Sequence, residues 1–591
     1  YIHLKSDIEL MKLIDKEEIL KGRNALVKVI AKPIFNFLQI DELNRVYEEV
    51  EHLEGNNVTI QYLKNQKIKT IFNNTHISDI PKTGSVIFIC NHPTGALDGV
   101  VLISLLSQIR PDIKFMGNFL LSRMIPLRPF FIDVNPFDST SSKNLNGIRS
   151  AINHLQNGGA MMLFPAGEVS SFHNGFQITD REWPISVIKL IQRSNAPVVP
   201  LFLSGKNSLP FHLLGLIHPR LRTLMLAREL VNKYDSTVRV EMGSPIYPTK
   251  TQNLTLKQLS NLLRTNVYIL QHKSHNTKKE TTECKQDPIA ENNASQLEAE
   301  VELLKPQFTL FEQGNFSVLF AATQKLNYVM KEIGRLREIT FREIGEGTNL
   351  ATDIDKYDAH YHQLFIWDNA AKKIVGAYRL GIGEEILKVQ GVKGFYTHSL
   401  FKMKSQIHNV LSSSIELGRS FIVKEYQKKA SSLVTLWKGI MHVLLKYDKC
   451  RYLIGPVSIS NDFSETSKLL IAEYLQKRNS NSQFSKFVVP INGFKGKKIK
   501  NIAKYIDSIP SIDLLDKLVS DLEDDLNGIP ILIKKYTQLN GKVLAFNLDP
   551  DFNNTLDGLL LLDLQEVPEN AIEMLSKTLD TDTRDRFKNR F

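Results

Sequence analysis

The first half of the chain alternates short apolar runs with segments that mix apolar and charged residues. Five short runs of mostly apolar residues are predicted to be strands: 86–90, which is also rich in β-branched residues, 130–134, 160–164, 198–203 and 238–242. Because helical patterns separate these strands, residues 59–271 are predicted to form an α/β domain around a central, partly parallel sheet. Residues 1–58 repeat charged and apolar positions in a helical manner and are predicted to form a helical N-terminal subdomain.

A polar tract, residues 272–296, follows and contains few aliphatic side chains. Such a segment buries little apolar surface, so it is predicted to be an interdomain linker. A short helix over 297–304 then opens a second α/β domain, residues 297–591, whose predicted strands are 363–367, 374–379, 414–422 and 451–454. A further helix and a strand pair around Ile531 and Val543 are expected near the C-terminus. With no visible internal repeat, the chain is predicted to join two different α/β domains.

The composition is that of a globular protein that has more than one core. The chain has 591 residues, of which 42% are apolar and 23% charged. Its three cysteines lie far apart and suggest neither a disulfide framework nor a metal site, so a reducing compartment is expected. No apolar run approaches the ~20 residues that span a bilayer, and the N-terminal residues lack a signal-peptide core. We therefore expect no membrane-crossing segment.

The net charge of +11 is compatible with an anionic partner or with simple solubility. No nucleic-acid motif is visible, and a nucleic-acid partner is not expected. Residues 210–230 interleave Leu and Ile with Arg220, Arg222 and Arg228, a pattern typical of a surface that dips into lipid. The alternative is a core helix whose arginine side chains extend to solvent. We predict a cytoplasmic protein that binds peripherally to the lipid surface of the inner membrane face.

Residues 85–99 carry the first candidate chemistry. They read S-V-I-F-I-C-N-H-P-T-G-A-L-D-G, a buried strand that ends at Asn91-His92 and a loop that leads to Asp98 at a helix start. A carboxylate beside an imidazole holds one tautomer and stabilises the protonated ring, so His92 would take a proton from a hydroxyl. A single histidine is more often a structural residue, and the strand–loop–helix context favours the catalytic interpretation.

These residues resemble the lysophospholipid/glycerolipid acyltransferase family, in which four residues separate the His and the Asp. Here five residues separate them, and a loop that contains glycine can absorb the extra one. Three further blocks match in order: Phe130-Phe131-Ile132-Asp133, Phe164-Pro165-Ala166-Gly167-Glu168 and Val198-Val199-Pro200. The resemblance covers about residues 60–250. It implies that His92 and Asp98 are catalytic and that Asn91, Phe164, Pro165, Gly167 and Glu168 contact the substrate. Gly167 and neighbouring amides are expected to stabilise an oxyanion.

The match also departs from the family at two positions associated with a phosphate-bearing acceptor. Val134 and Val169 stand where arginines are common. Burying a phosphate without its counter-ions is costly, so an acceptor with a hydroxyl and no phosphate is favoured. Arg128, Arg181 and Lys143 remain possible substitutes for the missing arginines.

The second half contains clusters of arginine and carboxylate residues. They occur in G-R-L-R-E-I-T-F-R (334–342), D-I-D-K-Y-D (353–358), G-A-Y-R-L (376–380) and I-E-L-G-R-S (415–420). Each cluster alone is more often solvated surface. In this order they resemble GNAT-type N-acyltransferases related to acyl-homoserine-lactone synthases. The resemblance extends to the ornithine-lipid N-acyltransferases, which are sometimes labelled haemolysin-like, and it covers about residues 306–591, including 541–559.

This second resemblance implies an active-site cluster that consists of Arg337, Phe341, Asp355, Asp358, Arg379, Glu416 and Arg419. Arginines pair with the carboxylate of an amino acid, and carboxylates receive its ammonium group. Glu416, acting through water, is predicted to be the base that frees the amine for direct attack on a thioester.

The donor is expected to bind where a loop opens a helix, as in the superfamily that the resemblance indicates. The corresponding residues, 423–432, lack the usual glycines, which disfavours coenzyme A. Gln427, Lys428, Lys429 and Ser431 are the predicted donor-binding residues, because the lysines suit an acidic carrier protein. We therefore expect acyl carrier protein as the partner that presents the acyl chain, with acyl-CoA as the alternative donor, and no tightly bound cofactor or metal.

Together the two halves resemble bifunctional ornithine-lipid synthases. The second half would N-acylate an amino acid, with ornithine favoured, from a 3-hydroxyacyl thioester, and the first half would O-acylate the hydroxyl of the resulting lyso-lipid. Glycine, lysine and a serine–glycine dipeptide remain alternative head groups. Two other functions also remain open: a lysophospholipid acyltransferase with a regulatory second domain, and a non-enzymatic membrane-lytic or scaffold protein.

Overall fold

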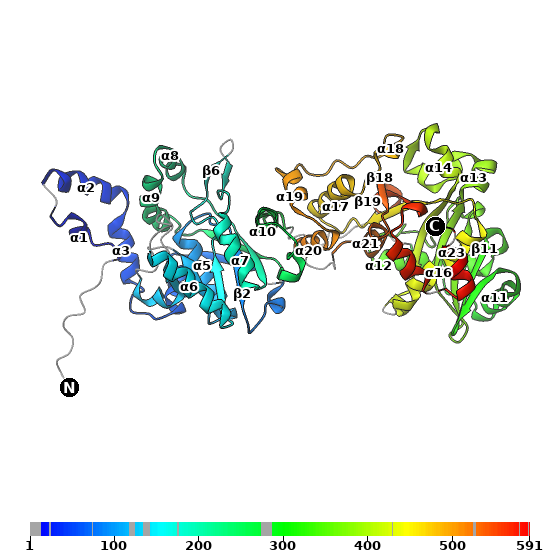
Figure 1. Cartoon of the computed structure of the whole chain (residues 1–591), viewed down its shortest axis with the longest axis horizontal. Coiled ribbons are helices and arrows are strands. Elements are labelled where there is room, and N and C mark those ends of the chain that lie inside the picture. Colours follow the sequence, from blue (N-terminus) through cyan, green and yellow to red (C-terminus); the bar gives the residue numbers. More distant parts are fainter. Residues whose placement is uncertain are drawn as a thin grey trace. The chain divides into compact units, whose positions relative to one another are not determined.

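The computed structural model describes residues 13–22, 25–73, 75–117, 124–133, 142–173, 177–273, 286–427, 430–523, 528–577, 579–588 and 590. The chain divides into two compact units. The first consists of Tyr1–Lys273 with Asp507–Pro510, and the second of Ser274–Ile506 with Ser511–Phe591. In Figure 1 the first unit is coloured mainly blue to green and the second mainly green to red. Residues 274–285 of the predicted linker lie outside the described residues.

The first unit is built on a seven-stranded sheet of order β1-β9-β8-β2-β5-β3-β4. The nine strands of the unit, including the β6–β7 hairpin, are β1 Lys69–Asn73, β2 Val86–Cys90, β3 Lys114–Gly117, β4 Phe131–Asp133, β5 Ala160–Leu163, β6 Ser171–His173, β7 Gln177–Thr179, β8 Val198–Leu203 and β9 Thr237–Met242. Strand β2 pairs in parallel with β5 and β8, while β8 and β9 are antiparallel. The predicted mixed, partly parallel sheet is therefore present, although Val134 lies outside the described residues.

Helices surround this sheet, and α5, α6 and α7 are labelled beside it in Figure 1. The helices are α1 Lys16–Leu20, α2 Ala25–Phe37, α3 Ile40–Glu48, α4 Asn56–Asn65, α5 Ala96–Ile109, α6 Ser142–Gln156, α7 Ile185–Ser194, α8 Leu209–Ile217, α9 Pro219–Val231 and α10 Leu256–Ile269. Strand β2 is buried along its whole length, as its apolar sequence requires. Leu43 and Val46 of α3 belong to the same apolar core as β2, and α3 joins this core through its contact with α9.

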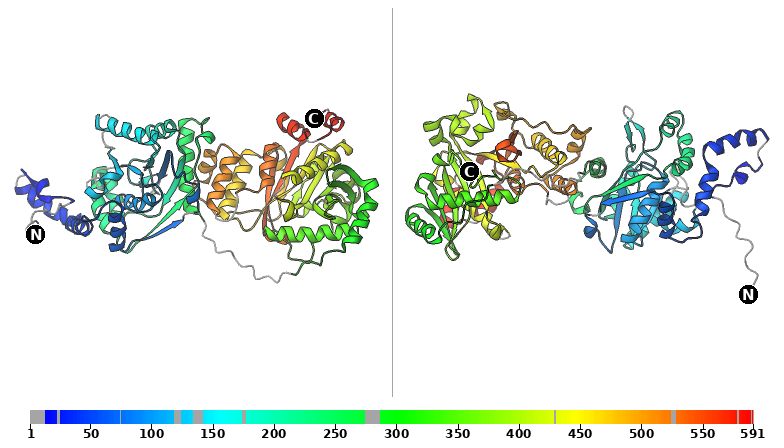
Figure 2. Two further views of the ribbon diagram at one scale, coloured as in Figure 1. Left: turned by 90° about the horizontal axis from the view of Figure 1, so that it is seen from below. Right: turned by 180° about the vertical axis from the view of Figure 1, so that it is seen from behind.

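The second unit contains an eight-stranded sheet of order β10-β11-β12-β13-β15-β16-β19-β18. Its strands, with the small β14–β17 pair, are β10 Thr309–Gln313, β11 Phe316–Ala322, β12 His362–Asp368, β13 Lys373–Ile382, β14 Phe401–Met403, β15 Ser414–Ile422, β16 Tyr452–Ile459, β17 Val488–Pro490, β18 Lys542–Asp549 and β19 Thr555–Asp563. Figure 2 shows the red C-terminal strand running through this unit. The C-terminal segment thus completes the sheet, because β19 pairs with β16 along its length.

The helices of this unit are α11 Ala294–Phe308, α12 Tyr328–Glu343, α13 Gly383–Gln390, α14 His408–Ser412, α15 Lys424–Gln427, α16 Ala430–Lys446, α17 Glu465–Arg478, α18 Ser482–Ser485, α19 Ile502–Ser508, α20 Ile512–Leu522, α21 Ile531–Gln538, α22 Glu569–Ser576 and α23 Thr581–Lys588. The prediction of a strand around Ile531 is wrong. Pro530 precedes a helix there, and the three-residue spacing of buried Ile533 and Tyr536 supports that helix rather than a strand. Val543 does lie in a strand, β18, whose partner is β19.

Strands β15 and β16 are parallel neighbours for only three residue pairs, which end at Glu416 and Ile454. Beyond this point each strand continues, β15 beside β13 and β16 beside β19. The two strands therefore stop forming a ladder in the middle of the sheet. No described helix is long and apolar enough to span a bilayer.

Candidate active sites

His92 and Asp98 meet at the end of β2. His92 Nδ1 lies 2.8 Å from Asp98 Oδ2, and the two side chains are 18% and 1% exposed. A carboxylate at this distance fixes the proton on Nδ1 and leaves Nε2 as the acceptor. The pair can therefore accept a proton at Nε2 and stabilise the imidazolium that forms.

The loop between them absorbs the extra residue through Gly95. Gly95 has φ +94°, a conformation that residues with a Cβ rarely adopt, and a Cβ there would lie 2.8 Å from Leu226 Cδ2. Asp98 Oδ2 also accepts the backbone N–H groups of Thr94 (2.9 Å) and Gly95 (3.0 Å), and the Thr94 hydroxyl donates to its other oxygen. The carboxylate thus organises the loop and the first turn of α5 as well as the imidazole.

Phe164 forms one wall of the histidine site. Its ring stacks on the His92 ring with centroids 4.0 Å apart, and Pro165 beside it is buried. The position follows from the sheet, because β5, which ends at Leu163, is the direct neighbour of β2. This contact restricts the imidazole to one plane.

Asn91 is used differently from the prediction that it contacts substrate. Its amide donates to Leu203 O at 2.9 Å and accepts Leu203 N–H at 2.8 Å. Both polar atoms of the buried amide are engaged in joining β2 to β8, so the side chain supports the sheet. Asp180, which the sequence did not single out, accepts the His92 N–H at 3.3 Å and the Ser170 hydroxyl at 2.6 Å. Burial raises the pKa of Asp180.

Gly167 and Glu168 lie in the turn after β5. The Gly167 N–H donates to Phe164 O at 2.9 Å, which does not favour this amide as an oxyanion donor. The expected oxyanion role of Gly167 and the neighbouring amides stays a prediction. Glu168 pairs with Arg222 at 2.8 Å and with Arg181 at 3.5 Å. Arg181 is thus near the site, Arg128 is exposed, and the Lys143 side chain lies outside the described residues. Arg222 reaches the turn from α9, and no local motif could have indicated it.

In the second unit, three buried arginines and three aspartates form a connected network. Arg337 Nη1 lies 3.0 Å from Asp358 Oδ1, and Arg379 Nη1 lies 2.7 Å from Asp355 Oδ1 and 3.3 Å from Asp358 Oδ2. Arg419 Nε lies 2.9 Å from Asp353 Oδ2. The structure therefore brings together residues of α12, β13, β15 and the loop that precedes β12.

The network is strongly electrostatic because it is removed from water. Burial alone would raise the pKa of Asp358, but the guanidinium groups of Arg337 and Arg379 hold that pKa below its usual range. The same balance of burial against Arg379 and Arg419 lowers the pKa of Asp355. Asp355 and Asp358 are therefore ionised, and an uncompensated change in a partner of either leaves a charge without its counter-ion.

Glu416 lies beside this network on β15. Its carboxylate accepts the Thr397 N–H at 2.8 Å, the Tyr396 N–H at 3.1 Å and the Tyr361 hydroxyl. A carboxylate has about four lone-pair sites, so three donors leave little room for an incoming proton. Its predicted role as the base stays a prediction that these contacts do not favour.

Aromatic side chains enclose the arginines. The Arg379 guanidinium lies 5.1 Å from the Tyr396 ring centroid, and that of Arg419 lies 4.8 Å from the same ring and 4.8 Å from the Phe552 ring. Phe341 packs edge-on against Phe552, with centroids 5.4 Å apart. Phe341 thus contacts the arginine site indirectly, because it packs against Phe552, which lies beside the Arg419 guanidinium. Tyr396 and Phe552 lack an identifying sequence pattern.

The predicted donor-binding residues follow β15. Gln427 is exposed, and its amide donates to Ile422 O at 2.9 Å. Lys428 and Lys429 lie outside the described residues, and so does the Ser431 side chain. Across the described part of the chain, no group of three or more His, Cys, Asp or Glu side chains has an arrangement that could hold a metal ion.

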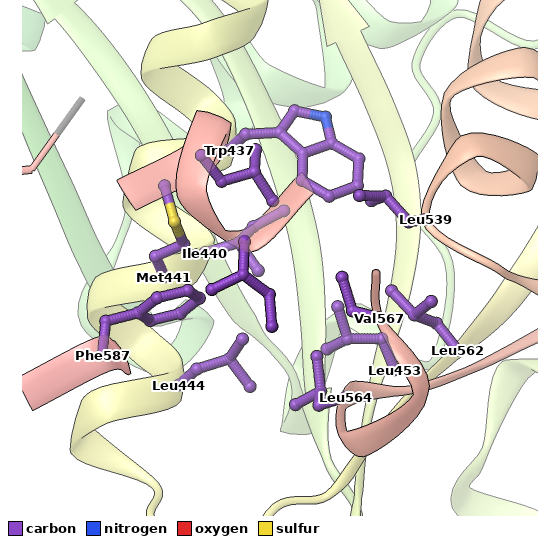
Figure 3. Close-up of a pocket in the computed structure, with 12 residues that line it drawn as sticks. Trp437, Ile440, Met441, Leu444, Leu453, Leu539, Leu562, Leu564, Val567 and Phe587 are labelled. Carbon is purple, nitrogen blue, oxygen red and sulfur yellow. The ribbon is translucent and has the colours of Figure 1, made fainter. Parts of the chain in front are cut away.

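An apolar cavity of about 30 Å³ lies between α16, the sheet and the C-terminal helices. Figure 3 shows Trp437, Leu453 and Phe587 among the side chains around it. This volume holds little more than a water molecule, so the cavity is a packing void rather than an acyl-chain pocket.

Comparisons with known proteins give two family matches. Residues 66–277 match the family described as "Acyltransferase", and residues 336–438 match "Acetyltransferase (GNAT) domain". A glycine N(alpha)-acyltransferase of Bacteroides thetaiotaomicron is 33% identical over 30% of this chain, and the match spans just over half (57%) of that relative. A lyso-glycine lipid O-acyltransferase of the same organism is 31% identical over 33% of this chain and 73% of its own length. The crystal structure of a 1-acyl-sn-glycerophosphate acyltransferase from Thermotoga maritima matches at 14% identity and a TM-score of 0.24, covering 40% of this chain and 88% of that one.

Proposed function

This chain belongs to the acyltransferase family that includes the lyso-glycine lipid O-acyltransferase of Bacteroides thetaiotaomicron, and on that basis we propose that it is a bifunctional acyltransferase of aminolipid synthesis. The second unit transfers a 3-hydroxyacyl group to the amine of an amino acid. The first unit then transfers a second acyl group to the hydroxyl of that lyso-lipid. The observation that carries this proposal is that two different acyl-transfer centres are built in one chain: His92–Asp98 on one sheet and the buried arginine–aspartate network on the other.

In the first step, the amino-acid carboxylate binds the guanidinium groups of the network, and the amine attacks the thioester carbonyl. In the second step, His92 Nε2 takes the proton of the lyso-lipid hydroxyl while Asp98 stabilises the imidazolium. Phe164 keeps the imidazole oriented, and Glu168, held by Arg222 and Arg181, positions the acceptor. Neither step needs a resident cofactor.

The head group has two candidates. The names of the relatives, a glycine N-acyltransferase and a lyso-glycine lipid O-acyltransferase in one organism, favour glycine. Ornithine is favoured by a different observation: the buried carboxyl groups around the arginine network outnumber the guanidinium groups, which leaves carboxyl groups that can accept a second ammonium group.

Acyl carrier protein is the proposed donor partner, on the basis of Lys428 and Lys429 in the sequence. The proposed membrane contact is the pair α8–α9, whose outward apolar side chains are exposed: Leu209 62%, Leu213 48%, Leu216 58%, Ile217 74% and Leu224 54%. An amphipathic surface of this kind, on a basic chain that handles a lipid, fits the inner face of a cell membrane.

The test is lipid mass spectrometry of a bacterial host that expresses the full chain, the His92→Ala variant or the Glu416→Ala variant. We expect the wild-type chain to yield a diacylated aminolipid, whose mass identifies the head group. His92→Ala should accumulate the mono-acylated lyso-lipid, and Glu416→Ala should yield neither species.

Purified protein supplies the control. The Glu416→Ala chain should still O-acylate added lyso-lipid, which shows that its first unit is folded. Equal loss of both products in the His92→Ala host would contradict the division of labour. Acylation of lysophosphatidate at least as fast as that of the lyso-aminolipid would instead support a phospholipid acyltransferase with a regulatory second unit.

A further inference from the structure

Two buried carboxyl groups of the second unit, Asp549 and Asp557, and the half-buried Glu346 have no cation of their own. The loop that carries Glu346 lies against the turn between β18 and β19, where Gly345 O accepts the Asn553 side-chain N–H at 2.7 Å. Asp549 and Asp557 are 3% and 1% exposed and lie at diagonal positions of the β18–β19 pair, where Asp549 is opposite Thr555 and Asp557 is opposite Asn547. Asp549 accepts the Tyr396 hydroxyl and the Asp551 N–H, both at 3.0 Å, and Asp557 accepts the Ser458 hydroxyl at 2.6 Å. Within the described residues, none of the three carboxyl groups forms an ion pair. Buried carboxylates without a counter-ion are costly, so this group is prepared for a cation.

These acids lie next to a guanidinium edge that is also unused. Arg379 is fully buried, yet its Nε and Nη2 have no hydrogen-bond partner in the described part of the chain. Its guanidinium faces the Tyr396 ring at 5.1 Å, and the Tyr396 hydroxyl reaches Asp549. The Tyr396 side chain therefore lies between the unpartnered guanidinium donors of Arg379 and the carboxyl group of Asp549, which forms no ion pair. An amino acid, with a carboxylate at one end and an ammonium group at the other, matches this arrangement.

The position in the sheet is consistent with a ligand site. Asp557 faces Ser458 on β16, and Arg419 lies on β15. Both positions come after the last paired residues of these strands, Glu416 and Ile454. Asp557, beside β16, and Arg419, on β15, thus lie on the two sides of the point at which β15 and β16 stop pairing.

The surrounding charges make proton transfer feasible near neutral pH. Burial, reinforced by the charges of Asp557 and Asp462 and opposed by Arg419, raises the pKa of Glu346 to about 8. Burial raises the pKa of Asp557 to about 7, with Asp549 adding to the effect and the Ser458 hydrogen bond and Arg419 opposing it. Burial also raises the pKa of Asp549, against its bonds to Tyr396 and Asp551. A general base works best when its pKa is close to the working pH.

We propose that Glu346, Asp549 and Asp557 form the subsite that receives the amino group of the acyl acceptor, and that the Glu346–Asp557 pair takes up the proton that the ammonium group loses before attack. This inference rests on the proposed function. The neutral amine forms the C–N bond and the C–S bond of the acyl thioester breaks. The second amine proton goes to the departing thiolate, and the carboxyl pair returns its proton to solvent.

The test measures how the rate of N-acylation by the purified full chain depends on pH. The substrates are glycine or ornithine and a 3-hydroxyacyl thioester, and the rate is measured as the release of free thiol. Wild-type kcat/KM should rise with pH and level off with an inflection between pH 7 and 8, below the range of a free amine. Asp557→Asn and Glu346→Gln should each lower kcat about 10²-fold or more and remove the inflection. Asp557→Glu, which keeps the carboxyl group, should restore it.

Asp563→Asn is the matched control. Asp563 ends the same strand and pairs with Arg451 at 2.6 Å, and this variant should keep the wild-type profile. O-acylation of added lyso-lipid in the same samples checks that the chain is folded. A wild-type profile without the inflection, or Asn and Gln variants within threefold of wild type, would overturn the inference. If the wild-type chain forms no amide at all, the proposed function itself fails.

Discussion

At the scale of single residues, the His92–Asp98 pair depends on one glycine. Five residues separate the two side chains in sequence, and the backbone of Gly95, at φ +94°, turns the loop so that they meet at 2.8 Å. The same loop donates two N–H groups to Asp98, so backbone shape and catalytic geometry are coupled.

Replacing Gly95 with alanine tests this coupling. The new Cβ would lie 2.8 Å from Leu226 Cδ2 in a strained conformation, and the loop must shift. Because a shift of about 1 Å at a catalytic group can cost 10²-fold in rate, we expect O-acylation of added lyso-lipid to fall by at least tenfold, with N-acylation unchanged. The matched control is Gly84→Ala, which has φ +83° and open space around its Cβ. The Gly84→Ala substitution should lower the free energy of unfolding by no more than about 1 kcal/mol. Normal O-acylation by Gly95→Ala would show that the loop tolerates other shapes.

At the scale of elements, helices α8 and α9 connect an exposed apolar surface with the turn after β5 that carries Glu168. The inward side chains Phe211 and Met225 are in the apolar core, whereas Leu216 and Ile217 point outward. Arg222, on α9, bonds Glu168 beside the histidine site. One face of residues 210–230 is therefore core, and the other is an exposed apolar patch whose contact with lipid stays a prediction.

A charged substitution on the outward face of α8–α9 tests the proposed membrane contact separately from the contact of Arg222 with Glu168. We expect Leu216→Asp/Ile217→Asp to weaken sedimentation of the protein with vesicles of anionic phospholipid by at least tenfold, because two exposed apolar side chains of this size contribute a few kcal/mol when they enter lipid. The KM for vesicle-bound lyso-lipid should rise, while kcat is retained. The control is Leu303→Asp/Val389→Asp, two residues that are 82% and 78% exposed in the second unit. Equal losses in both double variants would mean that α8–α9 is not the membrane contact.

At the scale of the whole molecule, the two centres lie on separate sheets in separate compact units. In the proposed function, the intermediate that connects them has a single acyl chain, and lipids with one chain bind membranes reversibly. Each unit can therefore act on an intermediate that another copy of the protein has made.

Mixing two variants that each lack one of the two acyl-transfer activities measures this exchange. We expect purified His92→Ala and Glu416→Ala proteins, combined on vesicles with amino acid and acyl thioesters, to produce the diacylated lipid that neither makes alone. The rate should increase with the amount of either chain. Failure of the mixture, while each chain retains its remaining half-reaction, would indicate that the intermediate does not leave the chain that made it.

Sequence patterns predicted the features that are local. The strands 86–90 and 414–422 match β2 and β15. For β2 the reason is that a short, β-branched run bounded by turn residues favours a buried strand. His92 and Asp98 were found because one strand, one loop and one helix start carry both. The helix at Ile531 was missed because a short apolar run has no distinct period.

Tertiary structure alone decided which distant side chains share a site. Arg222 reaches Glu168 from 54 residues away, and Tyr396 lies 153 residues before Asp549, its hydrogen-bond partner. Such pairings depend on the order of the strands in the sheet, which no local spacing encodes. The same is true of the surroundings of each carboxyl group: the arginine neighbours of Asp358 lower its pKa against the effect of burial, whereas burial raises the pKa of Asp557 to about 7. The sequence by itself was enough to predict the two acyltransferase domains and most of the charged residues in their candidate sites. Only the tertiary structure decided which partner each of those charged side chains contacts, because those contacts depend on the order of the strands.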